Sequence, residues 1–408
     1  MLFLYFKYNT MESLIIKFRG LLESVNPTFN RNLFEQINWK ARGIKIEGAR
    51  GVGKSTLMLQ QIKKNLPIKD TLYLTLDDLY FRSHTLTEVA EEFYQHGGRH
   101  LFLDEVHKYA NWQIEVKNLF DFKKQLQLVM SGSSILALQR SQADLSRRVI
   151  TYLLPGLSFR EYLGLHDGIS LPVIDLKELI LRHEEIAETM LKKIPSPLGK
   201  YRHYIQYGTY PFFNEGESDY FVRINQLINV IIDYDLIEAR AMEGSSLGQL
   251  KKLLYIISRS VPFTPNTNKL AEDLGISRGR ILEMLNILEK AQLIRNLRSS
   301  VGGVSLMNKP DKIYLNNTNL IYALADGKPE KGNVRETLFY AHIQDAGLSI
   351  SYPKAGDFLV QEKYTFEIGG KDKSFEQIKG SKDAYVVADD LERGVGNKIP
   401  LWLFGFLY

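Results

Sequence analysis

The segment from Gly48 to Ser55, GARGVGKS, constrains the fold of this chain more than any other feature of the sequence. It satisfies the pattern G-x-x-x-x-G-K-S/T, in which Gly53 and Lys54 occupy two of the fixed positions. The apolar run GIKIEG precedes it, and the helical pattern STLMLQQIKKN follows it. Backbone N–H groups at the start of such a helix can face phosphate. The sequence predicts a strand, a phosphate-binding loop and a helix; the alternative is a glycine-rich turn before an ordinary helix.

The side chains of this loop have separate expected roles. We expect the Lys54 ammonium to lie on the β- and γ-phosphate oxygens of a nucleoside triphosphate, and the Ser55 hydroxyl to be a ligand of Mg²⁺. Both groups neutralise charge that develops during phosphoryl transfer. The predicted nucleotide-binding residues of the loop and helix start are Gly48, Ala49, Arg50, Gly51, Val52, Gly53, Lys54, Ser55 and Thr56.

Two adjacent carboxylates end a later apolar run, HLFLDEVHK. Asp104 suits an outer-sphere ligand of Mg²⁺. Glu105 suits a catalytic base or a group that positions water, because such a carboxylate must lie within hydrogen-bond reach of the attacking water. Taken alone, an apolar run that ends in Asp-Glu only marks the end of a strand. Its place downstream of the loop favours a functional role.

Further candidates follow the next apolar run, LQLVM. Parallel strands would place Ser131 or Ser133 beside the nucleotide, where Ser131 could sense the γ-phosphate, although serines are also common in turns. Arg147 and Arg148 precede another predicted strand, and an arginine there could neutralise transition-state charge in a neighbouring subunit. The alternative is a solvated pair, and the sequence does not choose between the two arginines.

The region from residue 43 to about 164 alternates short apolar runs with helical patterns, which predicts a parallel α/β sheet. The expected strands are GIKIEG, TLYLTL, HLFLD, LQLVM and VITYLL, and the expected helices cover residues 54–65, 85–96 and 112–124. From about residue 174 to 240 the apolar period becomes helical, which indicates an all-helical connector.

The composition excludes several classes of protein. Because the chain has no cysteine, disulfides, thiolate metal sites and cysteine nucleophiles are absent, which agrees with a reducing cytoplasm. The first residues, MLFLYFKYNT, form an apolar run too short for a membrane span or a signal-peptide core, so no membrane association is expected. The formal net charge of +5 is smaller than the concentrated positive charge expected of a dedicated nucleic-acid binder.

The motif NKPD at residues 308–311 has the spelling of a guanine-recognition motif. It lies far from the phosphate loop, and no D-x-x-G follows that loop where GTPases need it. We interpret it as a turn and expect the nucleotide to be ATP.

The stretch KLAEDLGISRGRILEMLNILEKAQLI predicts two helices separated at Gly275, and a hairpin follows it. This arrangement resembles a winged helix. Its second helix could enter a DNA major groove with Arg278 and Arg280 leading. Other basic residues, Arg295, Arg298 and Lys309, could contact phosphates from the hairpin. Acidic residues dilute this face, and the alternative is a protein-interaction module.

Two carboxylates near the end of the chain, Asp357 and Glu367, lie on successive extended runs and are similar to the pair in PD-(D/E)XK nucleases. Glu336 upstream and Gln377 downstream complete the set. Gly369 stands where the nuclease lysine is expected, and Lys371 comes two residues later. Because a glycine pair favours a turn there, we expect a degenerate nuclease fold.

The ordered motifs GARGVGKST, HLFLDE, LVMSGSS, DLSRR, LPGLSFREYL, GTYPFF, NVRETLFY and FEIGGK resemble those of AAA-type ATPases of bacteria and archaea that carry a C-terminal nuclease-like domain of unknown function. The resemblance implies an ASCE-type sheet with the Asp104 strand beside the phosphate-loop strand. It also implies the roles given above for Lys54, Ser55, Asp104 and Glu105.

We therefore expect an α/β P-loop fold of the AAA type, followed by a helical connector, a winged helix and a small α+β domain similar to restriction endonucleases. The expected boundaries are a helical lead-in at 1–42, the ATPase core at 43–165, the connector at 166–249, the winged helix at 250–328 and the nuclease-like domain at 329–408. The expected function is Mg²⁺-dependent ATP binding and hydrolysis that controls the C-terminal modules, acting on DNA and with a possible homo-oligomer. The alternatives are a nucleotide switch that does not hydrolyse ATP and an ATP-gated nuclease.

Overall fold

The computed structural model describes residues 2–133, 145–238, 241–299, 309–325 and 327–408. These residues divide into two compact units. Unit 1 comprises residues 1–155 with 238–241, and unit 2 comprises residues 156–237 with 242–408. The tip of the predicted hairpin and part of the segment after the LVMSGSS motif lie outside the described residues.

Unit 1 is built on a five-stranded sheet with the strand order β2-β3-β4-β1-β5. Every neighbouring pair in it is parallel, as predicted. The strands are β1 (Gly43–Gly48), β2 (Thr71–Thr75), β3 (His100–Asp104), β4 (Gln127–Ser133) and β5 (Ile150–Leu153). All five predicted strands are confirmed, with ends that agree within one residue, except that β4 extends three residues beyond the predicted LQLVM.

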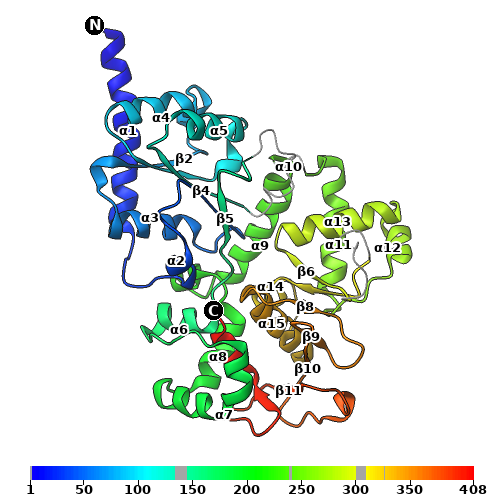
Figure 1. The fold of residues 1–408 in the computed structure, drawn as a ribbon. Coiled ribbons are helices and arrows are strands. Elements are labelled where there is room, and N and C mark those ends of the chain that lie inside the picture. The colour runs from blue at the N-terminus through cyan, green and yellow to red at the C-terminus, as the bar shows by residue number, and fades with distance from the viewer. Residues whose placement is uncertain (1, 134–144, 239–240, 300–308, 326) are drawn as a thin grey trace. The chain divides into compact units, whose positions relative to one another are not determined.

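Helices cover both faces of this sheet, with α1 and α3 on one face and α4 and α5 on the other (Figure 1). Their bounds are α1 Leu2–Ser24, α3 Lys54–Asn65, α4 Leu86–Gln95 and α5 Trp112–Phe122, and the short α2 (Asn32–Gln36) precedes β1. Thr85 begins α4 with a capping box, in which its hydroxyl accepts from the Glu88 N–H. The three helices predicted in this region are confirmed.

The prediction that the Asp104 strand lies beside the phosphate-loop strand is wrong. Strand β4 lies between β1 and β3 and pairs with both, so β3 is not a neighbour of the phosphate-loop strand. The central strand β4 is apolar through Leu128, Val129 and Met130, all fully buried, and can therefore occupy the middle of the sheet. The consequence is that Ser131, at the end of β4, lies between the loop and Asp104.

Unit 2 begins with helices that pack through apolar and aromatic side chains. They are α6 (Phe159–Asp167), α7 (Leu176–Lys193), α8 (Pro197–Tyr207) and α9 (Tyr220–Val230), followed by a π-helical turn at Ile231–Asp235 and the short α10 (Leu236–Glu238). Ile224, Ile228 and Ile232 form the buried stripe of this segment, in agreement with the predicted helical period.

The predicted helix-turn-helix and hairpin are present in unit 2. They comprise α11 (Leu247–Ser258), α12 (Thr267–Leu274), α13 (Arg278–Lys290), β6 (Ile294–Leu297) and β7 (Lys312–Leu315). Gly275 ends α12 with a φ of +64°, a conformation that glycine adopts without strain. The Ser277 hydroxyl caps α13 by accepting from the Arg280 N–H.

The rest of unit 2 is a five-stranded sheet with the order β12-β11-β10-β9-β8, preceded by α14 (Thr318–Leu324) and α15 (Lys331–Asp345). The strands are β8 (Ile350–Ser351), β9 (Phe358–Val360), β10 (Tyr364–Gly369), β11 (Ala384–Ala388) and β12 (Lys398–Pro400). The apolar terminal run folds as a buried 3₁₀ segment at Leu401–Phe406. No helix among the described residues combines the length and apolar character needed to cross a bilayer.

Candidate nucleotide site and carboxylate cluster

The loop between β1 and α3 has the backbone that its glycines predict. Gly51 and Gly53 have φ values of +81° and +97°, which side chains rarely tolerate. At Gly48 a Cβ atom would lie 2.4 Å from the carbonyl oxygen of Leu154, at the end of β5. Glycine is therefore required at all three positions, by the turn at two of them and by the neighbouring chain at the third.

The start of helix α3 is suited to an anion. Its N-cap, Gly53, provides no side-chain hydrogen bond, and the first turn contains no acidic residue. The N–H groups of the first turn thus have no capping side chain, and the helix dipole adds positive potential there. Together these features favour phosphate at the loop.

The Lys54 side chain is buried inside the loop. Its ammonium donates hydrogen bonds to the carbonyl oxygens of Gly48 at 3.1 Å and Ala49 at 2.9 Å. A cation is thereby held beside the loop N–H groups, where a phosphate chain would bring negative charge.

Asp104 is buried at the end of β3 and accepts hydrogen bonds at both carboxylate oxygens. The Tyr73 hydroxyl donates to Oδ2 at 2.5 Å, and the Ser131 hydroxyl donates to Oδ1. The Glu105 N–H also donates to Oδ1, at 3.1 Å. The carboxylate is therefore fixed in one orientation by groups from three adjacent strands, β2, β3 and β4.

Ser55, in the first turn of α3, lies close enough to Tyr73 to act on the pKa of its hydroxyl. Burial raises the pKa of Tyr73 far above its usual value, and the nearby charge of Asp104 adds to the rise. The phenol therefore stays protonated at neutral pH and remains a donor to Asp104. The bond between Tyr73 and Asp104 thus links β2 to the end of β3.

Glu105 has a left-handed backbone, with a φ of +52° and a ψ of +43°. A non-glycine residue in this region is uncommon, and such conformations cluster at functional sites. The turn directs the Glu105 carboxylate to the imidazole of His107, with Oε2 at 3.2 Å from Nδ1. The two adjacent carboxylates thus have different surroundings, since Asp104 is buried and Glu105 is half-buried.

The predicted arginine candidates lie away from the loop of their own subunit. Arg147 and Arg148 precede the first residue of β5, at the amino end of the sheet, whereas the loop follows the carboxyl end of β1. Arg148 forms a two-bond ion pair with Asp121, at 2.8 and 3.0 Å. Arg147 is exposed. The geometry thus excludes both from the nucleotide in cis and separates them from each other.

The residues that could hold a divalent cation fit together at the loop. The Ser55 hydroxyl and the Asp104 carboxylate are hard oxygen donors, the class that Mg²⁺ prefers. The Tyr73 phenol bonds to Asp104, and the Lys54 ammonium lies within the loop.

Three residues near the site were not predicted from the sequence: Tyr73, His107 and Arg31. Tyr73 lies in the middle of an apolar strand, where a tyrosine gives no sign of its hydroxyl partner. Arg31 is buried before α2 and lies more than a dozen residues upstream of the loop. His107 follows Asp104 and Glu105 closely, so proximity in sequence was the one available signal.

A family model described as an AAA domain matches residues 40–163. This match covers β1 to β5, the phosphate loop and the Asp104 strand. This segment is similar to AAA-type P-loop domains. A second model, described as a domain of unknown function, matches residues 198–331, which follow the AAA domain in the chain.

The chain is also similar to an uncharacterized protein of the archaeon Methanocaldococcus jannaschii. The two are 27% identical, and the match covers 91% of this chain and 85% of the relative. The resemblance thus extends well beyond the AAA domain.

Among solved structures, the chain is similar to the ORC1 protein of Aeropyrum pernix in complex with DNA, with a TM-score of 0.31, 11% identity, and coverage of 76% of this chain and 91% of that one. It is also similar to AMPPCP-bound DnaA of Aquifex aeolicus, with a TM-score of 0.26, 14% identity, and coverage of 63% and 84%.

In unit 2, the predicted carboxylates Glu336, Asp357 and Glu367 are brought together with two lysines. Lys312 lies between Glu336 and Asp357, at 3.4 and 3.7 Å. Burial raises the pKa of Glu336, and the charge of Asp357 adds to the rise. Burial likewise raises the pKa of Glu367.

A lysine other than the expected one pairs with Glu367. The Lys373 ammonium lies 2.5 Å from Glu367 Oε1 and donates to Gln377 Oε1 at 3.0 Å. The stem of Lys373 lies where a side chain at Gly369 would lie, since a Cβ there would be 2.6 Å from Lys373 Cγ. Lys371 is exposed. The lysine paired with Glu367 thus comes from position 373, after the turn that the glycine pair predicts.

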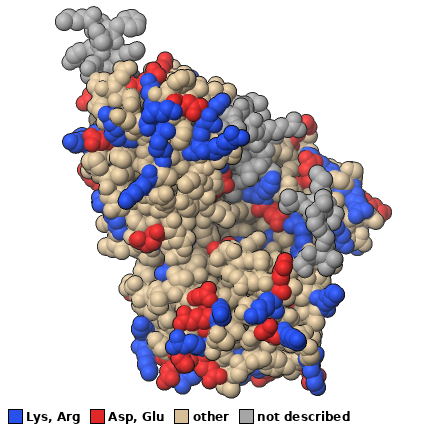
Figure 2. All heavy atoms as spheres, viewed as in Figure 1, with Lys and Arg blue, Asp and Glu red and all other residues tan. Residues whose placement is uncertain are grey.

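The basic residues of the hairpin do not form the predicted phosphate-binding row. Arg295 is buried and bonds to Asp345 and to the carbonyl oxygen of Asn316, so that prediction is wrong for Arg295. Arg298 pairs with Glu289 at 3.2 Å. On the face drawn in Figure 2, Lys and Arg side chains are interspersed with Asp and Glu. Arg278 is exposed at the start of α13, while Arg280 pairs with Glu283.

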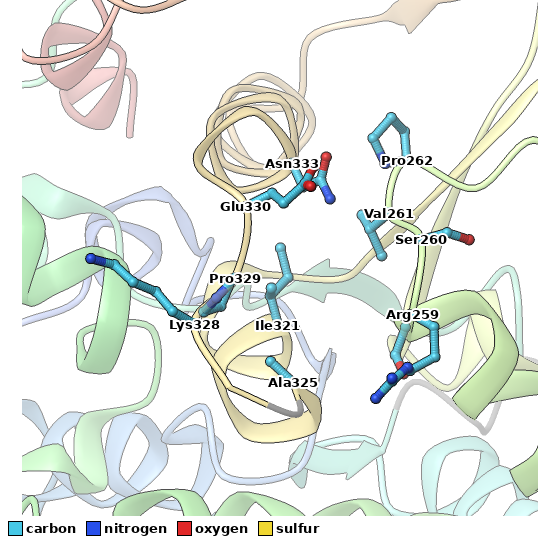
Figure 3. A pocket seen from close by; sticks show the side chains of 11 residues that line it. Arg259, Ser260, Val261, Pro262, Ile321, Ala325, Lys328, Pro329, Glu330 and Asn333 are labelled. Atoms are coloured by element: carbon cyan, nitrogen blue, oxygen red, sulfur yellow. The ribbon is translucent and has the colours of Figure 1, made fainter.

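A pocket of about 500 Å³ lies elsewhere in unit 2, apart from the predicted site residues (Figure 3). Its walls come from the end of α11, the end of α14 and the start of α15. Arg259, Lys328 and Glu330 supply its charged groups. Neither the phosphate loop nor the carboxylate cluster contributes to it.

Proposed function

We propose that this protein binds ATP with Mg²⁺ at residues 48–56 and hydrolyses it. The observation that carries the proposal is the Lys54 ammonium enclosed by the loop, together with the buried Asp104 carboxylate that Tyr73 and Ser131 fix at the end of β3. Such a convergence of a hydroxyl, a carboxylate and an ammonium at an uncapped helix start suits a phosphate chain with a divalent cation. The AAA domain match supports the same assignment.

Each residue has a distinct role in this proposal. Lys54 and the loop N–H groups bind the phosphate oxygens, and Ser55 and Asp104 hold Mg²⁺, which supplies charge neutralisation when bound. Ser131 orients Asp104 through its hydroxyl. Glu105 accepts a proton from the attacking water, for which its half-buried carboxylate is available once it turns from His107.

Titration with a non-hydrolysable ATP analogue in Mg²⁺ tests the binding step. We expect Lys54→Ala to weaken the affinity at least about 100-fold, because it removes the ammonium that the loop encloses. Lys63→Ala, on the same helix but remote from the loop, is the matched control and should leave the affinity unchanged. Equal affinity in Lys54→Ala and the wild type would refute the proposed site.

The proposal extends to the C-terminal modules. The α12–α13 pair with the β6–β7 hairpin is a winged helix in this account, and nucleotide state controls its access to DNA. Arg278 supports the DNA assignment because it is exposed at the start of α13. Arg147, the exposed member of its pair, supports a homo-oligomer in which it acts on the neighbouring nucleotide.

A second candidate function is ATP-gated cleavage of DNA by the carboxylate cluster. The observation that favours it is Lys373, which takes the space of the missing lysine at position 369 and pairs with Glu367. Paired carboxylates with a lysine are the groups that metal-dependent phosphodiester cleavage uses.

Nicking of supercoiled plasmid in Mg²⁺, with and without ATP, tests this second candidate. Cleavage that is lost in both Asp357→Ala and Lys373→Ala, but not in Lys371→Ala, would establish it. No cleavage by the wild type under any of these conditions would leave the cluster as a degenerate site.

A further inference from the structure

The phenol of Tyr73 bonds to Asp104, one of the two residues proposed to hold Mg²⁺. Its hydroxyl donates to Asp104 Oδ2 at 2.5 Å. The roles proposed for Lys54, Ser55, Asp104, Ser131 and Glu105 involve neither strand β2 nor a tyrosine. Ser131 also bonds to Asp104, but at Oδ1.

The Tyr73 ring is held so that the hydroxyl can point only into the site. Tyr73 is 4% exposed, and its register partner on β3 is Phe102, which points to the same face as Asp104 two residues later. Phe18 of α1 stacks on the ring, with the two centroids 6.4 Å apart. Tyrosine has only two side-chain torsions, so packing that fixes the ring costs little conformational entropy. The hydroxyl donor is thereby kept in place.

The other two donors to Asp104 leave one of its carboxylate oxygens to Tyr73. Ser131 and the Glu105 N–H both bond to Oδ1, so Tyr73 alone among the described side chains fixes Oδ2. Without it, the carboxylate would be free to rotate about the Oδ1 contacts. The angle at which Asp104 faces Ser55 would then vary.

We propose that Tyr73 is a positioning residue for the divalent cation that accompanies the nucleotide, acting through Asp104. The inference rests on the proposed function. It goes further, because it assigns the metal-dependent part of nucleotide affinity to a residue of β2. The phosphate-dependent part stays with the loop N–H groups and Lys54.

The test compares nucleotide affinity with and without the metal. A fluorescent non-hydrolysable ATP analogue is titrated into the full chain in Mg²⁺ and in EDTA, and the ratio of the two dissociation constants measures the metal contribution. Tyr73→Phe should reduce this ratio about tenfold, the effect of about one charge-assisted hydrogen bond. Affinity in EDTA should stay within about twofold of the wild type. Mn²⁺ titration of the nucleotide complex, followed by electron paramagnetic resonance, should show the same loss directly.

Two further variants separate positioning from general damage. Tyr109→Phe removes another phenol that donates to a carboxylate in the same unit, Glu115 at 2.7 Å, and should leave the ratio unchanged. Tyr73→4-aminophenylalanine keeps the ring and an N–H donor, so it should restore most of the ratio. Thermal unfolding of each variant checks that the chain is folded.

The outcomes distinguish this inference from the proposal beneath it. An unchanged ratio in Tyr73→Phe, equal losses of affinity in Mg²⁺ and EDTA, or no recovery with the amino analogue would each overturn the role of Tyr73 while leaving ATP binding intact. A wild type that binds no nucleotide in either condition would overturn the proposed function, and this inference with it.

Discussion

The Arg31 guanidinium donates a hydrogen bond of 2.7 Å to the carbonyl oxygen of Val52, in the middle of the phosphate loop. A second nitrogen of the same guanidinium donates to the carbonyl oxygen of Pro155, just after β5, also at 2.7 Å. Arg31 is buried, and it therefore ties the loop to the end of the sheet. The segment before β1 thus shapes the nucleotide site, although it supplies no group to the phosphates.

Replacement of Arg31 by lysine should loosen this loop, because an ammonium cannot reproduce the planar fork that reaches both carbonyl groups. We expect Arg31→Lys to weaken binding of the ATP analogue about tenfold and to destabilise unit 1 by about 1–3 kcal/mol. Titration and thermal unfolding measure the two effects. Arg42→Lys is the matched control, since Arg42 donates to the Phe120 and Lys123 carbonyl groups at the other end of the sheet. The account of Arg31 fails if both variants bind equally well.

Replacement of the two arginines before β5 should have different effects on the rate of ATP hydrolysis. Arg147→Ala should lower the rate of ATP hydrolysis at least about 100-fold with little change in nucleotide affinity, because a finger stabilises the transition state. Arg148→Ala should lower the melting temperature instead, since Arg148 pairs with Asp121. Mixing Arg147→Ala with Glu105→Gln subunits should restore part of the activity, as each supplies what the other lacks. No recovery on mixing would contradict action between subunits.

The carboxylate cluster should make stability depend on pH. Since burial and Asp357 raise the pKa of Glu336, its contribution to stability is fully present below the unfolded pKa of about 4.3 and is lost as the pH rises through the higher folded value. In Glu336→Gln this pH-dependent loss is absent. The difference in melting temperature, variant minus wild type, should therefore increase by a few degrees, on the order of 2–4 °C, between pH 4 and pH 8.

Calorimetry of unit 2 unfolding across this range checks the sign. Glu188→Gln, on the exposed side of α7, is the control and should show a difference that does not vary with pH. A Glu336→Gln difference that falls with rising pH would mean that Lys312 outweighs burial at this carboxylate.

DNA binding by the α13 region should depend on Arg278 more than on Arg280, because Arg280 pairs with Glu283 while Arg278 is exposed. In a mobility-shift titration at low salt, Arg278→Ala should reduce affinity about fivefold to tenfold and lower the salt dependence by about one phosphate contact. Lys290→Ala, at the other end of the same helix, should have little effect. A wild type that shifts no DNA would assign these helices to protein partners instead.

Most of the fold of the AAA domain could be predicted from local sequence patterns. The strands, the helices after them and the loop follow from apolar period and glycine spacing, and each is where those patterns place it. The order of strands was not accessible in the same way, because pairing of β4 between β1 and β3 depends on contacts remote in sequence. The expectation for the Asp104 strand failed for this reason.

The same division holds for the sites. Lys54, Ser55, Asp104 and Ser131 could be predicted as site residues because each lies at or near the end of a recognisable element. Tyr73 and Arg31 were missed because their roles are set by partners on other strands and loops. Lys373 was missed because the nuclease motif places its lysine two residues after Glu367, at position 369. In the structure, the side chain of Lys373 occupies the space beside Gly369 from the other side of a turn.

Steady-state ATP hydrolysis by the wild type and Glu105→Gln, with binding of the ATP analogue measured on the same preparations, tests whether this protein hydrolyses ATP at the loop. We expect turnover in the wild type, a loss of about 100-fold or more in Glu105→Gln, and affinities within about threefold of each other, because the carboxylate acts on the water and not on the phosphates. Negligible turnover in both proteins with intact binding would contradict hydrolysis and leave a nucleotide switch.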